Sequence, residues 1–351
     1  MDQDASGCTI RAMRFTVALG LILLLAACGG SAAAPSSAAS ASADAVGSSS
    51  AKPAASGLTK VKGAYSQISA AQGAMYIAID QGFYAKHGLD VELTQVAGTQ
   101  QIPAMTAGEL QFGTPGGNEL VSSVLAGAPM VGIAVSSNYP LQSLYGGKGV
   151  KDVREVAGKA VAITTAGSTS EAGAKIFLRH YGLEKQVSYQ PAGTVQGVLA
   201  VLEKGEAAAG VTSPPTTILM EKAGLVELVN GPKLGEPMVH AAIIVTRDYL
   251  KNNPDLIKRY LQAYIEGWQF ATNRANEPAM IRSLAKWTKS DDDVAKASYE
   301  YVVEAWQRDK IPAFSDKAIE NIMSIVDNPK AKDAKASDFY DNSLIVSLAK
   351  T

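Results

Sequence analysis

Hydroxyl and amide side chains recur where expected strands end and helices begin. They form five clusters along the chain: Ser66 and Gln67; Thr114, Gly116 and Asn118; Ser136 and Asn138; Ser168, Thr169 and Ser170; and Thr212 and Ser213. Free backbone N–H groups at a helix start, joined by hydroxyls that rotate to fit, suit an anion or a strongly polar head group. A single cluster is explained equally well by helix capping, for which Ser, Thr and Asn are favoured in any protein. Five clusters at one edge of a sheet predict a ligand pocket.

Residue patterns typical of catalysis and metal binding are sparse. The histidines lie far apart in sequence, and two cysteines, Cys8 and Cys28, are too few for a four-thiolate zinc site. His240 begins an apolar strand, where it could face the pocket or cap it. The stretch around Ser168 is not a Gly-x-Ser-x-Gly elbow, and no phosphate-loop or dinucleotide motif follows a strand. The sequence predicts a binding protein without catalytic activity, cofactor or metal.

Composition narrows the class of partner. The chain has 351 residues with 47% hydrophobic residues, and its 32 Lys+Arg against 33 Asp+Glu leave a net charge of −1. No long-range positive field is available to attract nucleic acid, so nucleic-acid binding is excluded. The length suggests about two domains of ordinary size.

The elements that must position the polar clusters alternate between strands and helices from residue 58 onward. Apolar patterning predicts strands at 60–65, 89–93, 110–113, 130–135, 159–163, 187–189, 208–211 and 240–245. It predicts intervening helices at 71–81, 101–107, 119–125, 168–180 and 195–203 and one starting at Pro214-Pro215, then helices at 254–270, 278–287, 291–306 and 316–326. Strands separated by single helices indicate an α/β fold with mostly parallel sheets. Ligands of such folds bind beyond the carboxyl ends of the strands, where the clusters lie.

The first residues are typical of an export signal. Arg11 and Arg14 precede the apolar run 15–27, which is too short to span a bilayer in the mature protein. The sequence Leu-Ala-Ala-Cys-Gly at 25–29 resembles a bacterial lipobox, which implies removal of residues 1–27 and acylation of Cys28. A plain secretory signal with a chance cysteine is the alternative. The acidic start also leaves open whether translation begins at Met1 or at Met13.

An Ala- and Ser-rich segment, residues 28–57, follows the signal. It has no aromatic residue and no apolar periodicity, so it cannot bury a core. We expect a flexible tether between the lipid anchor and the folded domain.

Several ordered stretches of the folded part resemble a known family. Residues 78–84, 87–92, 105–112, 125–131 and 158–162 are similar to ABC-transporter substrate-binding proteins of the sulfonate/nitrate/taurine and thiamine-pyrimidine-precursor group. The resemblance implies a two-lobe, type II periplasmic-binding-protein fold with the ligand in a cleft between lobes that close around it. The first lobe would comprise residues 58–147 and 244–351, and the second lobe residues 148–243.

The resemblance also implies a ligand site and partners. Ser66, Gln67, Thr114, Gly116 and Asn118 would contribute from the first lobe, and 168–170 from the second. The expected partners are a small solute, the transmembrane subunits of an ABC permease and, through the lipid, a membrane; the protein itself would be a monomer.

Departures from the family leave the ligand open. Gln111 and Ala208 stand where the family often has an acidic residue, and Thr212-Ser213 precede the prolines where it often has an acidic or aromatic one. Because the predicted loops hold no arginine, a sulfonate-like, nitrate-like or neutral polar solute fits better than a phosphonate.

Two other functions remain open. A sensory receptor could use the same closing cleft, and a thiamine-pyrimidine-precursor synthase shares the fold. The absence of cysteine after Cys28 argues against the synthase.

Overall fold

The computed structural model describes residues 57–350, which belong to one compact unit. The expected signal sequence, the lipidated Cys28 and nearly all of the tether lie outside these described residues. Between residues 57 and 350, no helix is both long enough and apolar enough to cross a membrane.

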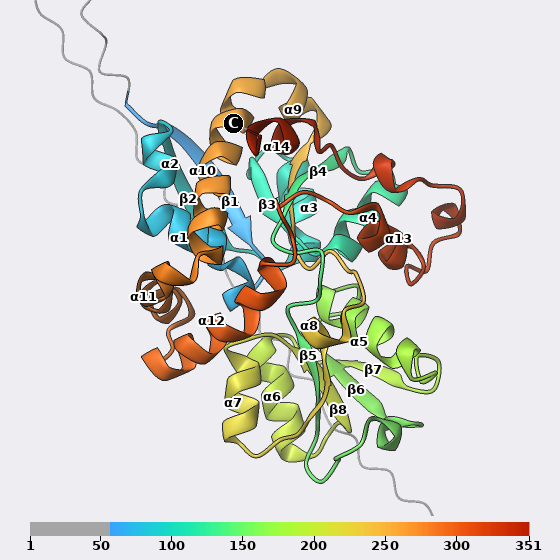
Figure 1. Cartoon of the computed structure of the whole chain (residues 1–351). Helices are drawn as coiled ribbons and strands as arrows, with labels where there is room; N and C mark the ends of the chain where they lie inside the picture. The colour runs from blue at the N-terminus through green and yellow to red at the C-terminus, as the bar shows by residue number, and fades with distance from the viewer. Residues whose placement is uncertain (1–56, 351) are drawn as a thin grey trace, which may run out of the picture. The chain divides into compact units, whose positions relative to one another are not determined.

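Two five-stranded sheets form the cores of two lobes (Figure 1). The first sheet has the order β2-β1-β3-β10-β4, and its strands are β1 (Thr59–Tyr65), β2 (Leu89–Gln95), β3 (Phe112–Thr114), β4 (Met130–Val135) and β10 (Ala242–Thr246). The second has the order β7-β6-β8-β5-β9, with β5 (Ser143–Gly146), β6 (Ala160–Ile163), β7 (Ser188–Pro191), β8 (Ala209–Thr212) and β9 (Glu227–Asn230). The predicted α/β fold with two lobes is confirmed.

One strand of each sheet runs against the others. β10 is antiparallel to β3 and β4, and β5 is antiparallel to β8 and β9, so both sheets are mixed. β5 and β9 were not predicted. All four residues of β5 are buried, so its sequence shows none of the apolar–polar alternation that reveals a half-exposed strand.

The chain crosses between the lobes twice, after β4 and before β10. Because β5 pairs within the second sheet, the first crossing lies before Ser143, and not at residue 147 as the resemblance implies. Ala242 and Ile243 pair with β4 and therefore belong to the first sheet, although they were counted with the second lobe.

Helices of the first lobe come from both segments of the chain. The N-terminal segment contributes η1 (Ala70–Gln72), α1 (Gly73–Asp80), α2 (Phe83–Lys86), α3 (Gly98–Thr106) and α4 (Gly117–Leu125). The C-terminal segment contributes α9 (Arg247–Asn252), α10 (Pro254–Thr272), η3 (Arg274–Asn276), α11 (Glu277–Thr288), α12 (Asp292–Trp306), α13 (Asp316–Met323), η4 (Pro329–Lys332), η5 (Ala336–Asp338) and α14 (Ser343–Leu348). The predicted C-terminal helices agree with α10 to α13 to within three residues at each end.

The second lobe is simpler. Its helices are η2 (Val153–Val156), α5 (Thr169–His180), α6 (Val195–Lys204), α7 (Thr216–Lys222) and α8 (Gly231–Leu234). The helix expected at the two prolines begins at Thr216, with Pro215 as its N-cap.

Aromatic packing holds the returning C-terminal segment on the first lobe. Tyr260 of α10 stacks on Phe112 of β3 with ring centroids 3.8 Å apart, and both are fully buried. Trp306 of α12 is also fully buried in this core. Burial of such large apolar side chains fixes the sheet whose strand ends carry the polar clusters.

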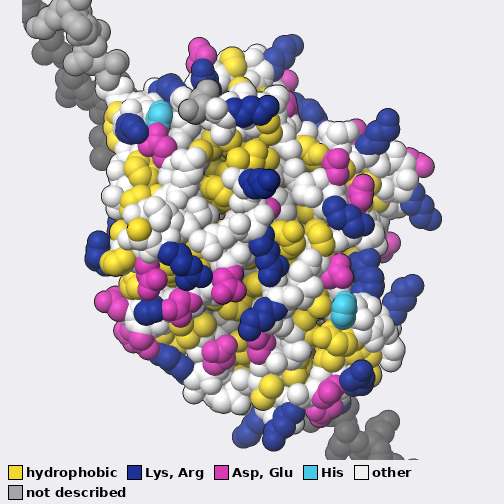
Figure 2. Space-filling model, viewed as in Figure 1, with side chains coloured by type: hydrophobic (Ala, Val, Ile, Leu, Met, Phe, Trp, Pro, Cys, Tyr) yellow, Lys and Arg dark blue, Asp and Glu magenta, His cyan; other side chains and the backbone are white. Residues whose placement is uncertain are grey.

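Charged side chains on the face shown in Figure 2 are mixed in sign. Lys and Arg are interspersed with Asp and Glu, as the net charge of −1 leads one to expect.

Candidate functional site

A polar cleft lies where the strand ends of the two lobes face each other. Its larger cavity has a volume of about 180 Å³ and its smaller one about 20 Å³, and Ser66, Gln67 and Val195 line both. The larger is also lined by Ile68, Gln95, Ala97, Gly98, Glu119, Thr164, Thr165, Ser168, Gly193, Thr194 and Gln196. The smaller is also lined by Ser69, Gln72, Gln142, Thr169, Ser170, Thr212, Ser213, His240 and Ala241. Most of the lining residues have a hydroxyl or an amide side chain.

Helix starts surround the larger cavity. Gly98 begins α3, Glu119 lies in the first turn of α4, Ser168 is the N-cap of α5, and Val195 begins α6. The first N–H groups of a helix have no partner within the helix and carry partial positive charge. The starts of four helices, with the positive ends of their dipoles, thus border one space.

Direct hydrogen bonds join the lobes across the cleft. The Gln67 amide donates to Thr164 Oγ1 at 3.3 Å, and the hydroxyls of Ser69 and Ser213 are 2.9 Å apart. The backbone N–H of Ala70 donates to the Pro214 carbonyl at 2.9 Å. These contacts connect the first loop of one lobe to the strand ends of the other, so the lobes touch around the cavity.

Glu119 is the acidic residue of the lining. It is 7% exposed, and its Oε2 accepts a hydrogen bond of 3.2 Å from the Thr169 hydroxyl of the other lobe. Burial raises the pKa of the Glu119 carboxyl to about 7, although hydrogen bonds from Thr169 and from nearby backbone N–H groups oppose the shift. The group therefore changes charge near neutral pH.

A hydroxyl cluster forms the wall of the second lobe. Ser170 Oγ accepts from the Thr164 N–H at 2.8 Å, and it lies 2.9 Å from both Thr164 Oγ1 and Ser168 Oγ. Because a hydroxyl both donates and accepts, the direction of these bonds can reverse to suit a ligand.

Thr212 offers an unused hydroxyl at the end of β8. The residue is 1% exposed, and its Oγ1 has no hydrogen-bond partner among the described residues. A buried polar group without a partner costs free energy, which a bound ligand could recover. Thr212 lines the smaller cavity.

His240 is the histidine of this lining, and it is neutral. Burial lowers its pKa to about 3, and its Nδ1 accepts the Leu141 N–H at 3.2 Å. The ring therefore carries no charge, lines the smaller cavity and also accepts a backbone N–H.

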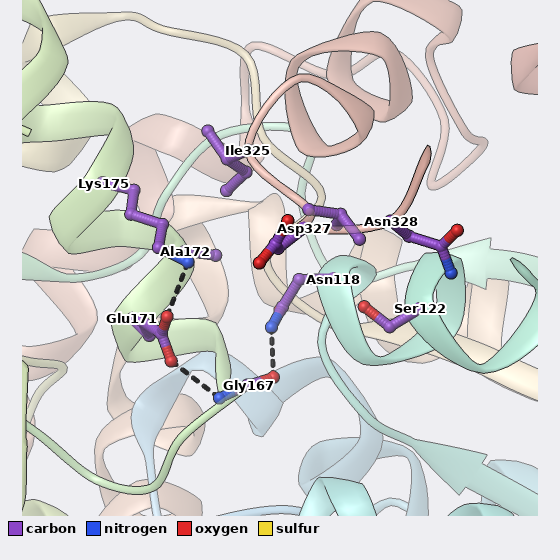
Figure 3. Close-up of a pocket in the computed structure, with 10 residues that line it drawn as sticks. Asn118, Ser122, Gly167, Glu171, Ala172, Lys175, Ile325, Asp327 and Asn328 are labelled. Carbon is purple, nitrogen blue, oxygen red and sulfur yellow. Dashed lines mark hydrogen bonds and ion pairs between the residues drawn. The ribbon is translucent and has the colours of Figure 1, made fainter. Parts of the chain in front are cut away.

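An outer pocket of about 270 Å³ opens beside the cleft (Figure 3). Asn118 of α4 points toward the Gly167 carbonyl of the second lobe and donates a hydrogen bond to it. Glu171 and Lys175 of α5 line this pocket and pair at 2.6 Å. Asn118 and Glu119 are adjacent on α4 but line the outer pocket and the cleft, respectively.

Seven of the twelve predicted ligand-binding residues line the cleft. They are Ser66, Gln67, Ser168, Thr169, Ser170, Thr212 and Ser213. Thr114 and Ser136 line a separate small space beside α1, where the Thr114 hydroxyl donates to the Ala64 carbonyl at 3.1 Å. Gly116 is packed against the other lobe, because a Cβ there would lie 1.9 Å from Thr169 Oγ1.

Asn138 requires a correction, because its polar groups serve the first lobe rather than the cleft. Its side-chain amide donates to Asp309 Oδ1 at 3.1 Å and to the Ala313 carbonyl at 2.8 Å, while its Oδ1 accepts the Ser315 N–H at 2.9 Å. The cluster at 136–138 lies at a strand end, as predicted, but Asn138 forms its hydrogen bonds with the returning C-terminal segment.

Sequence reasoning missed Glu119. Its position in the first turn of a helix is common for an acidic residue, since the helix dipole favours it there. The one available signal was that this helix starts directly after a strand of the predicted sheet. Gln95, Gln142 and Gln196 were also missed, because their roles depend on how the lobes face each other.

Comparison with known proteins identifies the family of the chain. The model of the family described as NMT1/THI5 like matches residues 70–278. A search of curated proteins found no significant match to this chain.

Solved structures of bacterial binding proteins share the fold. The ligand-binding component of an ABC-type import system from Staphylococcus aureus is 14% identical with a TM-score of 0.69, and the match covers 84% of this chain and 100% of that one. The alkanesulfonate-binding protein SsuA from Xanthomonas axonopodis pv. citri is 15% identical with a TM-score of 0.64, and the match covers 83% of this chain and 97% of that one. The nitrate-binding protein NrtA from Synechocystis PCC 6803 is 17% identical with a TM-score of 0.64, and the match covers 84% of this chain and 89% of that one.

Proposed function

The chain belongs to the NMT1/THI5-like family, and from this membership and its cleft we propose that it is the solute-binding component of an ABC importer. It captures one small polar solute outside the cytoplasm and presents it to the transmembrane subunits of the permease. The solved structures of the same fold include proteins named for binding alkanesulfonate and nitrate, which supports this class of function.

The polar cavity between the lobes is the observation that carries the proposal. Its walls come from strand ends and helix starts of both lobes, so a ligand there touches both at once. Contacts that only the closed arrangement offers would stabilise it over an open one, which is how binding produces a closed complex. The candidate ligands are a sulfonate, nitrate, taurine or a pyrimidine-precursor-like solute.

The lining supports binding rather than turnover. Ser168 and Ser170 form hydrogen bonds with each other and with Thr164, and the neutral His240 accepts a backbone N–H. Both cysteines of the chain, Cys8 and Cys28, precede the described residues. We infer that the cleft holds its solute unchanged.

A thermal-shift screen of the purified chain in detergent tests the proposal. The panel contains taurine, alkanesulfonates, nitrate and thiamine-precursor pyrimidines. Because a ligand that binds only the folded state stabilises it, we expect the melting temperature to rise with ligand concentration for one chemical class. Unchanged melting with every compound would contradict the proposal.

We also propose that Cys28 carries lipid and that residues 28–57 tether the domain to a membrane. Several acyl chains bind a bilayer stably, since each buried methylene contributes about 0.8 kcal/mol. In detergent phase partitioning we expect the wild-type chain in the detergent phase and a Cys28→Ser variant in the aqueous phase, once the signal peptide is removed from both. Equal partitioning of the two would refute the lipid anchor.

A further inference from the structure

The charge of the cleft comes from Glu119. Among the described residues that line the two cavities there is no Lys and no Arg. His240, the remaining ionisable side chain, is buried and neutral. An ionised Glu119 therefore gives the cleft a negative charge, with no cation in its lining to balance it.

The Glu119 carboxylate lies at the helix starts where an anionic ligand would otherwise bind. The first turns of α4 and α5 meet around its carboxylate, and the Thr169 hydroxyl donates to its Oε2. The backbone N–H groups of Gly116, Glu119 and Thr169 also stabilise its charged form. The positive helix ends thus have an internal anion, and an external one would be a second negative charge in a buried space.

The second carboxylate oxygen is placed for a hydrogen-bond donor. Glu119 Oε1 lies beside Gly98, where a Cβ would come within 2.5 Å of it, and both residues line the larger cavity. The absence of a side chain at Gly98 keeps the space beside this oxygen free. An amino or hydroxyl group of a solute could donate to it.

An independent feature marks the same cleft as a ligand site. Thr212 is 1% exposed, its buried hydroxyl has no partner among the described residues, and the residue lines the adjoining smaller cavity. The amide groups of Gln67, Gln95 and Gln196 complete a lining that can donate and accept. None of these groups carries charge.

We propose that Glu119 makes the cleft selective for solutes that present an N–H or O–H donor and carry no net negative charge, and that it disfavours nitrate and simple alkanesulfonates. This rests on the proposed function and narrows its ligand class to neutral or zwitterionic solutes. Glu119 acts by accepting a hydrogen bond from the solute and by repelling anions.

Few charged groups face Glu119 from the packed elements. α3 and the remainder of α4 contain no ionisable residue. On α5, Glu171 and Lys175 pair with each other and line the outer pocket. Because the pKa of Glu119 is raised to about 7, an anion should bind more weakly as pH rises from about 6 to about 8, when the carboxyl ionises.

Titration calorimetry on the purified full-length chain in detergent tests this selectivity. The probes are nitrate, ethanesulfonate, taurine and 4-amino-5-hydroxymethyl-2-methylpyrimidine, each measured at about pH 6 and about pH 8. Wild type, Glu119→Gln and the control Glu171→Gln are compared, the control removing a carboxylate outside the cleft. Glutamine keeps the shape of Glu119 and can still accept the Thr169 hydrogen bond, and melting curves verify that each variant is folded.

We expect the wild type to bind taurine or the pyrimidine at least roughly tenfold more tightly than ethanesulfonate and nitrate at pH 8. Glu119→Gln should reduce this ratio by roughly tenfold and abolish the pH dependence of anion binding, whereas Glu171→Gln should leave both unchanged.

Tighter binding of an anion by the wild type, or an equal preference in wild type and Glu119→Gln, would overturn the selectivity while leaving the binding function intact. Absence of binding by every probe in wild type and variants would overturn both. Should Glu119→Gln fail to fold, the pH dependence of the wild type decides: anion affinity that does not fall between pH 6 and pH 8 overturns the proposal.

Discussion

The Thr212 hydroxyl differs from its polar neighbours because it is buried without a hydrogen-bond partner among the described residues. Ser213, the next residue, pairs with Ser69, and Ser170 pairs with Thr164. Leaving a hydroxyl unpaired costs about 1–3 kcal/mol, so the isolated protein gains nothing from Thr212 that valine would not supply. We propose a role in ligand binding for this polar group.

Thr212→Val should therefore separate binding from stability. We expect the free energy of unfolding without ligand to stay the same or to rise by up to about 1 kcal/mol, and ligand binding to weaken by about 1–2 kcal/mol. Chemical denaturation and calorimetric titration measure the two quantities.

Thr216→Val is the matched control. Its hydroxyl is also buried and unpartnered, but Thr216 is not part of the cleft lining. Equal weakening of binding in both variants, or in neither, would contradict the role of Thr212.

The residue types in the sequence predicted the polar chemistry of the cleft better than they predicted which residues line it. Ser168 and Thr212 could be selected because helix caps and strand ends are visible in the sequence. Asn138 matched the same pattern, yet its amide holds the segment around Asp309 and Ala313, far away in sequence. Glu119 was missed because its pairing with Thr169 exists only once two lobes meet. The spacing of residues along a short segment does not predict which distant residues its side chains will contact.

At the scale of elements, the starts of α4 and α5 are in direct contact across the two lobes. Gly116 precedes α4 with a φ of −72°, which any residue can adopt, so its lack of a side chain matters for space alone. A Cβ at Gly116 would meet Thr169 Oγ1 at 1.9 Å and Glu119 Oε2 at 2.3 Å. The arrangement of the lobes therefore leaves no room for a methyl group at residue 116.

We predict that Gly116→Ala weakens ligand binding by about 1–3 kcal/mol, because the added methyl group keeps the lobes apart or forces them to shift. Binding is measured by titration with the ligand found in the screen. A second substitution, Thr169→Ala, removes the closest clashing atom. We therefore expect Gly116→Ala to weaken binding less in a Thr169→Ala background than in the wild type. Unchanged affinity in Gly116→Ala would show that the bound state does not need this contact.

Most elements could be predicted because their periodicity is local. β4 spans the predicted residues, and α5 begins after Ser168 as its cap indicated. β5 and β9 could not be predicted from the sequence. β5 is short and wholly buried, and β9 is recognised only by its pairing with β5. The antiparallel strands β5 and β10 follow from the two crossings of the chain, which is a property of topology rather than of any segment.

At the scale of the whole molecule, the C-terminal helices belong to one lobe but contact both. Lys222 of α7 pairs with Asp293 of α12 at 2.5 Å, and Arg308, after α12, donates to the Pro232 carbonyl at 2.5 Å. The first pair is exposed, so it contributes little stability.

The central claim is that the interlobe cleft binds one small polar solute and releases it unchanged. The most direct measurement is calorimetric titration of the purified chain with the compound that gives the largest thermal shift, followed by chemical analysis of that compound after prolonged incubation. We predict saturable binding at one site per chain, weakened by Thr212→Val, with the compound recovered intact. Conversion of the compound into a product, or binding that Thr212→Val and the other cleft substitutions leave unchanged, would contradict the claim.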